Sequence, residues 1–144
     1  MIVQVVLLLT VVATSVSGSD WPAPLRSPAR ISGAVVIIAG VSLALAGARS
    51  LGPALTPLPQ PKSGATLRED GVYRFARHPI YGGLLLLALG VALIASPWAL
   101  VPGVLLGLVL YGKSIREEGW LVERFPEYVT YRERVRHRFV PFVW

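Results

Sequence analysis

The sequence contains no cysteine, only two histidines and few charged residues. Without cysteine, a disulfide framework and a thiolate metal site are both excluded. Two histidines without clustered aspartates also argue against a metal centre, so no metal is expected. Charged residues make up 15% of the chain, whereas soluble domains carry about 25%. This scarcity of charge points away from an ordinary soluble domain.

The charged residues are unevenly distributed and leave three long uncharged stretches, residues 1–19, 31–48 and 79–112. A soluble fold of this size could not bury all three, because most of its surface must be solvated. A lipid bilayer can accommodate them. We therefore predict an all-α fold, a polytopic membrane helical bundle of about four transmembrane helices. The 144 residues are enough for one domain.

The lengths of the stretches place the predicted helices. Residues 1–17 lack the basic start of a cleaved signal peptide, so a retained transmembrane helix is favoured over that alternative. A second helix is predicted in residues 31–48. The stretch 79–112 would form a helix of roughly 50 Å, against a hydrocarbon core of about 30 Å. It must fold back, with the turn at Ser96-Pro97, because proline starts a helix well and continues one badly.

Two basic segments flank the predicted hairpin of residues 79–95 and 97–112. The proline-rich residues 49–77 should form an irregular loop. Residues 113–144 alternate charged and apolar side chains, which predicts two amphipathic helices, the second beginning at Pro126.

The two basic segments should lie on one side of the membrane, because the hairpin begins and ends there. They hold twelve of the fourteen Lys and Arg residues, five and seven respectively. Basic residues gather in cytoplasmic loops and near anionic headgroups. Both termini and any site at this end are therefore predicted to be cytoplasmic. Membrane lipids explain the net charge of +6 more simply than nucleic acid, and no nucleic-acid partner is expected.

A first group of candidate residues surrounds the start of the predicted third helix. His78 stands at the cap position and Pro79 at the first helical position. A helix start is favourable for anions, because its amides and dipole point outward. Gly82 and Gly83 carry no side chain, so another group can approach the backbone closely. The alternative is a basic anchor at the membrane interface.

A second group follows the predicted fourth helix. If the helix continues, as we expect, Lys113 and Glu117 are i, i+4 partners on one face. Glu118 then points about 100° away. A solvated row of salt bridges is the alternative to a Glu117 that turns inward to meet a polar or cationic ligand. Both groups belong to the same end of the hairpin and could face one pocket.

Several motifs occur together in one order along the chain. They are Arg77-His78-Pro79-x-Tyr81-x-Gly83, Glu117-Glu118-x-x-Leu121 and Phe125-Pro126-Glu127-Tyr128. In combination they resemble the isoprenylcysteine carboxyl methyltransferase family and its bacterial relatives, which are related to phospholipid methyltransferases. The resemblance covers about residues 51–141. It implies a cofactor-binding catalytic core in residues 51–144, preceded by two transmembrane helices in residues 1–50.

The resemblance implies an integral membrane methyltransferase that uses S-adenosylmethionine. Its acceptor would be lipophilic, with an isoprenylcysteine-type carboxylate most like the family and phospholipid amines or small thiols as other candidates. By motif position, the implied cofactor-binding residues are Ala65, Thr66, Leu67, Arg68, Tyr73, His78, Pro79, Ile80, Tyr81 and Glu117. Lys113 stands where the family has a basic residue near the substrate carboxylate, although a lysine cannot make the bidentate contact of an arginine.

Two other functions are compatible with parts of the sequence. Sterol-type membrane reductases that use NADPH share an Arg-His-Pro helix start, usually followed by Asn and Tyr, but Ile80 stands at the Asn position here. A non-catalytic membrane scaffold would use the same basic motifs only as anchors.

Overall fold

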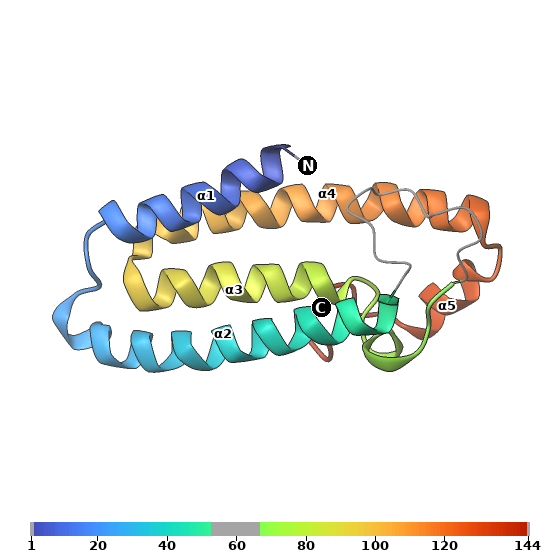
Figure 1. The fold of residues 1–144 in the computed structure, drawn as a ribbon, viewed down its shortest axis with the longest axis horizontal. Coiled ribbons are helices and arrows are strands. Elements are labelled where there is room, and N and C mark those ends of the chain that lie inside the picture. The colour runs from blue at the N-terminus through green and yellow to red at the C-terminus, as the bar shows by residue number, and fades with distance from the viewer. Residues whose placement is uncertain (1, 53–66, 144) are drawn as a thin grey trace.

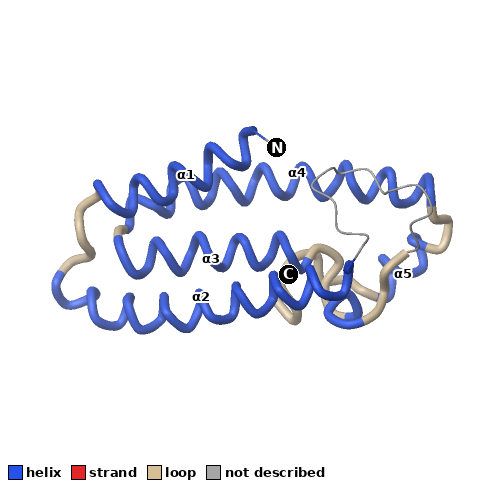
Figure 2. The backbone as a smooth tube through the Cα atoms, in the orientation of Figure 1, coloured by secondary structure: helices blue, strands red, loops and turns tan. Residues whose placement is uncertain are grey.

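The structure is a computed structural model that describes residues 2–52 and 67–143. Within these residues the chain forms helices and loops without a strand (Figures 1 and 2). The elements are α1 (Ile2–Ser17), α2 (Ala23–Leu51), a 3-10 helix (Gly71–Arg74), α3 (Pro79–Ala95), a 3-10 turn (Pro97–Ala99), α4 (Leu100–Arg124) and α5 (Tyr128–Arg134). The predicted all-α class is confirmed.

The four long helices run side by side as a bundle (Figure 1). Helix α2 packs along α3, and α1 packs mainly on α4. We call the end at which α2 ends, α3 begins and α4 ends the polar end. Helix α1 also starts there, since Lys113 Nζ lies 3.5 Å from Gln4 Oε1. The hairpin thus brings both predicted groups of site residues to one end of the bundle.

Two helical segments, Ala23–Leu51 and Pro97–Arg124, are long and apolar enough to cross a membrane. Helices α1 and α3 are apolar but shorter, with 16 and 17 residues, or about 25 Å at 1.5 Å per residue. Large apolar side chains point outward on α1, α2 and α4, including Leu9, Val35 and Leu108. Such extended exposed apolar surface is typical of contact with lipid. Four membrane spans stay a prediction.

Three helix boundaries differ from the prediction. Helix α2 begins at Ala23 and runs through Pro28, although the sequence placed its start at residue 31. Pro28 is the sixth residue of α2, so it removes one intrahelical hydrogen bond, and the helix nevertheless continues through it. Helix α4 continues to Arg124 and the chain breaks at Phe125, so the tail holds one separate helix instead of two. That helix begins at Tyr128, two residues after the predicted start.

Glycines bring α2 and α3 into direct backbone contact. Gly33, Gly40 and Gly47 are the buried residues of α2, and their seven-residue spacing keeps them on one face. A Cβ atom at Gly33 would lie 2.7 Å from the carbonyl oxygen of Gly90, and one at Gly40 would lie 2.9 Å from that of Gly83. Small residues of this kind let membrane helices pack closely. The contact fixes α3 against α2.

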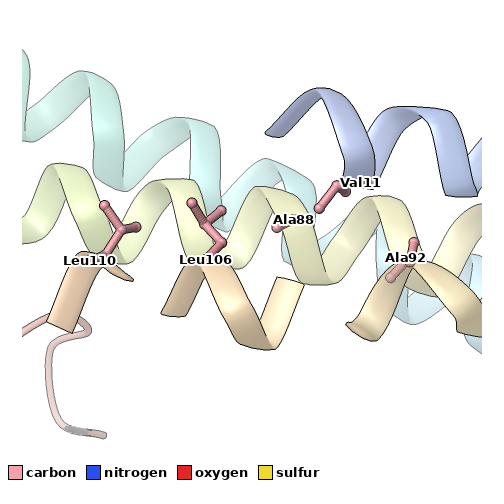
Figure 3. Close-up of a cluster of buried hydrophobic side chains, with 6 residues drawn as sticks. Val11, Ala88, Ala92, Leu106 and Leu110 are labelled. Atoms are coloured by element: carbon pink, nitrogen blue, oxygen red, sulfur yellow. The ribbon is translucent and has the colours of Figure 1, made fainter. Parts of the chain in front are cut away.

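The opposite side of α3 packs on α4 and α1 through a small apolar core (Figure 3). Leu106 and Leu110 of α4 are fully buried against Ala88 and Ala92 of α3, together with Val11 of α1. Alanines facing leucines let the helices approach without leaving a void. This packing holds the last turns of α4 beside the start of α3.

The predicted turn at Ser96-Pro97 is confirmed at the end of the bundle opposite the polar end. The Ser96 side chain accepts from the N–H of Trp98 (3.3 Å) and donates to the carbonyl of Ser19 (2.8 Å). The Trp21 indole donates to the carbonyl of Ala92 (3.0 Å). These contacts tie the α1–α2 connection to the hairpin turn.

Candidate active site

The start of α3 places His78 as the sequence predicted. His78 occupies the N-cap position and Pro79 the first turn. The His78 side chain does not cap its own helix. Its ring instead contacts the two acidic residues of α4, as described below. Pro79 is fully buried. Pro79 and Ile80 both lie against Gly47 of α2, and this contact positions the start of α3.

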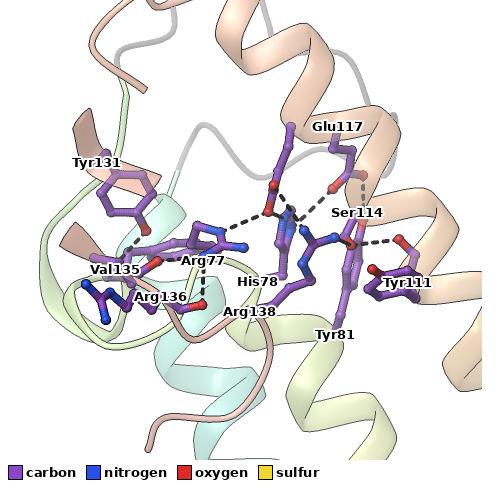
Figure 4. A network of polar contacts seen from close by, with 12 residues as sticks. Arg77, His78, Tyr81, Tyr111, Ser114, Glu117, Tyr131, Val135, Arg136 and Arg138 are labelled. Carbon is purple, nitrogen blue, oxygen red and sulfur yellow. Dashed lines mark hydrogen bonds and ion pairs between the residues drawn. The ribbon is translucent and has the colours of Figure 1, made fainter. Parts of the chain in front are cut away.

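A buried carboxylate, Glu118, links three basic groups, Arg77, His78 and Arg138, which are labelled in Figure 4. Its side chain is 5% exposed. Oε1 accepts from Arg77 Nε at 2.9 Å and lies 3.1 Å from His78 Nε2. Oε2 lies 3.4 Å from Nη2 of Arg138. Because a buried charge is stable only when it is paired and hydrogen-bonded, Glu118 depends on these partners and they depend on it.

Glu117 forms the more accessible edge of the same cluster. Its side chain is 14% exposed, with Oε2 3.6 Å from His78 Nδ1 and Oε1 3.9 Å from Lys113 Nζ. The Tyr81 hydroxyl donates to Oε1 of Glu117. The Tyr81 ring stacks on His78 with 5.5 Å between centroids, and Lys113 Nζ lies 4.9 Å from the centre of the same ring. Four predicted site residues therefore meet at one place, with Glu117 at their partly exposed edge and Glu118 more deeply buried.

The segment after α5, residues 135–139, returns to the start of α3. We call it the tail segment. The Arg77 guanidinium donates to the carbonyl oxygens of Val135 (2.6 Å) and Arg136 (2.9 Å). The backbone N–H groups of residues 77 and 78 donate to the next two carbonyls, at 3.0 and 2.7 Å. The tail segment is thus held to the site mostly through its main chain.

The close approach predicted at Gly82 and Gly83 is made by the protein itself. A Cβ atom at Gly82 would lie 2.1 Å from the carbonyl oxygen of Phe139, and one at Gly83 would lie 2.7 Å from Cβ of Ala44. The tail segment therefore covers the first turn of α3, which the sequence analysis had treated as open to a ligand.

The main-chain carbonyl of Tyr73 is joined to a second apolar cluster, which lies between the loop, α4 and α5. The Tyr131 hydroxyl donates to the carbonyl oxygen of Tyr73 at 2.7 Å. Tyr128, Tyr131 and Val135 are buried there against Leu67 and side chains of α4. Burial raises the pKa of both Tyr73 and Tyr131, so their hydroxyls stay protonated. This cluster attaches α5 to the loop that leads to His78.

A hollow of about 830 Å³ opens beside this cluster. It is lined by Leu67, Arg68, Asp70, Arg74, Phe75 and Arg134. The ion pair between Arg134 and Glu69 crosses part of its wall. Two predicted cofactor residues, Leu67 and Arg68, thus line the hollow, while His78, Tyr81 and Glu117 belong to the buried cluster. Ala65 and Thr66 lie outside the described residues.

Three residues of the cluster were missed by the sequence analysis as site residues: Arg77, Glu118 and Arg138. Arg77 and Glu118 are direct neighbours of predicted residues, and their charge is the signal that could have found them. Glu118 was expected to point away from the Glu117 side. Both carboxylates are nevertheless engaged, because His78 at the start of α3 lies between them and Arg138 of the tail segment also reaches Glu118. No local signal marks Arg138, whose role depends on the return of the tail segment.

The sequence profile of the phospholipid methyltransferase family matches residues 28–128. The chain belongs to this family. The match covers most of α2 and all of α3 and α4 with both groups of site residues, and the family lies within the methyltransferase group that the motifs resembled. Membership supports methyltransferase activity in general and a location in the membrane. No curated protein matches the chain.

Proposed function

We propose that this family member is an integral membrane methyltransferase that transfers a methyl group from S-adenosylmethionine to a lipophilic acceptor. The observation that carries the proposal is the cluster of His78, Tyr81 and Glu117 at the polar end of an otherwise apolar bundle. Glu117 is its partly exposed edge. A cytoplasmic nucleoside and a membrane-dissolved acceptor can both reach such a boundary.

The residue types at the polar end suit this cofactor. The cofactor carries a sulfonium, an ammonium, a carboxylate and ribose hydroxyls. Glu117 can accept hydrogen bonds from the ammonium or the hydroxyls, since its contacts to His78 and Lys113 are long, at 3.6 and 3.9 Å. In the hollow, Arg68 and Arg74 offer positive charge beside the apolar side chain of Leu67. Both signs of charge on the cofactor therefore have partners within the described chain.

The cofactor supplies an activated methyl group. The chain has to hold and align the reactants and exclude water from them. A carboxylate or thiolate acceptor needs little help from a base. Lys113, whose side chain is 21% exposed, is the cation placed to hold an acidic acceptor. An isoprenylcysteine-type carboxylate fits this role, and phospholipid amines or small thiols are the other candidates. The acceptor would enter sideways between the helices.

The proposal includes the topology. Helices α1 to α4 would all cross the membrane, with the polar end and both termini cytoplasmic. The described segments at the polar end carry eleven of the fourteen Lys and Arg residues of the sequence, which supports this orientation through the positive-inside rule.

Calorimetry on the purified protein in detergent tests the cofactor. We expect S-adenosylhomocysteine to bind and NADPH not to bind. Glu117→Gln should weaken binding by about tenfold, or about 1.4 kcal/mol, whereas Glu123→Gln on the exposed side of α4 should have no effect. Binding of NADPH alone would indicate a reductase. If neither S-adenosylhomocysteine nor NADPH binds, the result would indicate a non-catalytic scaffold.

Incubation with labelled S-adenosylmethionine and a membrane lipid extract then identifies the acceptor. A labelled lipid-soluble product is expected from the wild type and not from Glu117→Gln. Label found only in water-soluble material would contradict a lipophilic acceptor.

A further inference from the structure

His78 lies between two carboxylates, with one ring nitrogen directed at each. Nε2 lies 3.1 Å from Glu118 Oε1, and Nδ1 lies 3.6 Å from Glu117 Oε2. One face of the ring stacks on Tyr81, and Phe139 of the tail segment lies against it at 6.3 Å between centroids. The ring is therefore held in place, and its chemistry depends on which nitrogen carries the proton.

The partners of Glu118 decide that question. Arginine is always charged in proteins, and Glu118 is paired with both Arg77 and Arg138. The carboxylate is therefore ionised and can only accept hydrogen bonds. Its Oε1 lies within hydrogen-bond distance of Nε2, so the proton must be on Nε2. A lone pair there would face another lone pair at 3.1 Å.

The opposite nitrogen is then free to accept. The distance from Nδ1 to Glu117 Oε2 exceeds that of a hydrogen bond. In a neutral ring, Nδ1 carries a lone pair on the more accessible side of the cluster. Nδ1 and the Glu117 carboxylate thus form two neighbouring acceptors. They suit a ligand group that can donate at least two hydrogen bonds, such as an ammonium or a vicinal diol.

We propose that Glu118 is a positioning residue that fixes the proton of His78 on Nε2 and so presents Nδ1, beside Glu117, as an acceptor for a donor group of the cofactor. The identity of the ligand rests on the proposed function, whereas the position of the proton does not. Glu118 itself is enclosed by three basic groups and acts through the histidine.

Nitrogen-15 NMR of the imidazole tests the proton position without cofactor or activity. The chain has two histidines, and His137 packs on Phe142 outside the cluster, so His137→Gln leaves His78 as the single signal. In mildly alkaline buffer we expect the ring to be protonated on Nε2 alone. A ring protonated on Nδ1, an even mixture of the two forms, or a ring that stays doubly protonated would overturn the proposal.

Two variants separate positioning from a merely structural role. In Glu118→Gln the amide can donate, so the proton of His78 should move at least partly to Nδ1. In Glu117→Gln it should stay on Nε2. An unchanged proton position in a folded Glu118→Gln protein would overturn the proposal. If that variant does not fold, the spectrum of the protein with native Glu118 alone decides.

Calorimetry with two ligands identifies the donor group. S-adenosylhomocysteine carries an ammonium and a ribose diol, whereas 5′-methylthioadenosine keeps the diol and lacks the ammonium. Glu118→Gln should weaken S-adenosylhomocysteine about threefold to fivefold, or about 0.7–1.0 kcal/mol, less than Glu117→Gln. An equal loss for both ligands assigns the diol, and a loss for S-adenosylhomocysteine alone assigns the ammonium. Unchanged binding of both would overturn the role in recognition while leaving the NMR result and the proposed function separately testable.

Discussion

Replacing Gly82 by alanine should loosen the tail segment from the start of α3. The new methyl carbon would lie 2.1 Å from the carbonyl oxygen of Phe139, and ordinary contacts begin at 3.4 Å, so the tail segment must move by about 1 Å. Overpacking of this kind costs about 2 kcal/mol. The shift also strains the 2.7 Å hydrogen bond from His78 N, worth about 1 kcal/mol. Alanine regains about 1 kcal/mol of helix propensity, which leaves a loss of about 2 kcal/mol.

Limited trypsin digestion in detergent measures this local loosening, because four arginines lie in residues 132–138. Gly82→Ala should be cut there faster than the wild type and should unfold at a lower denaturant concentration. Gly112→Ala on α4 is the matched control, since a Cβ atom there meets nothing within 4 Å. Identical cleavage and stability of the two variants would refute the described path of the tail segment.

His78→Ala should weaken S-adenosylhomocysteine binding more than Arg26→Ala, because Arg26 lies at the opposite end of α2 from the site; equal affinities by calorimetry would refute the placement. Tyr131→Phe should lower the free energy of unfolding by about 1 kcal/mol, since it loses a hydrogen bond to the loop. Tyr128→Phe should leave the free energy of unfolding unchanged, because in the described part of the chain the buried Tyr128 hydroxyl has no hydrogen-bond partner. Denaturant titrations that show equal losses for the two variants would contradict this. Gly40→Leu should push α2 from α3 and lower the melting temperature by several degrees, and an unchanged temperature would mean that the glycine contact is dispensable.

The helices could be predicted because each is an uncharged run whose composition suits only an apolar environment. The turn at Ser96-Pro97 could also be predicted, because the length of the uncharged stretch and the position of the proline both required it. The start of α2 was predicted too late because the predicted helix was limited to the uncharged stretch. The helix in fact begins before that stretch and includes Arg26 and Pro28.

The contact between α2 and α3 has a signal in the sequence. Gly33, Gly40 and Gly47 recur every seven residues, and Gly83 and Gly90 share that spacing. A heptad repeat of glycine on two apolar helices indicates close packing between them. Hydropathy alone cannot reveal it, because hydropathy reports polarity and not side-chain size.

The site could be predicted as far as it is local. Residues 78–81 share a helix start and Lys113 shares a helix face with Glu117, and both relations follow from helix geometry. The remaining part depends on residues far apart in sequence. Arg138 reaches Glu118 only because the chain turns at Phe125 and again after α5.

The hydrogen bonds from residues 77 and 78 hold the tail segment by its carbonyl oxygens rather than by its side chains. These hydrogen bonds do not depend on which side chains stand at positions 136 and 137. The side chains of Val135 and Phe139 are constrained, because both are buried. Substitutions can therefore accumulate in this stretch without altering its course. The tail segment should therefore keep its path when the side chains at positions 136 and 137 are replaced, and it completes the site although it lies beyond residue 128, where the family match ends.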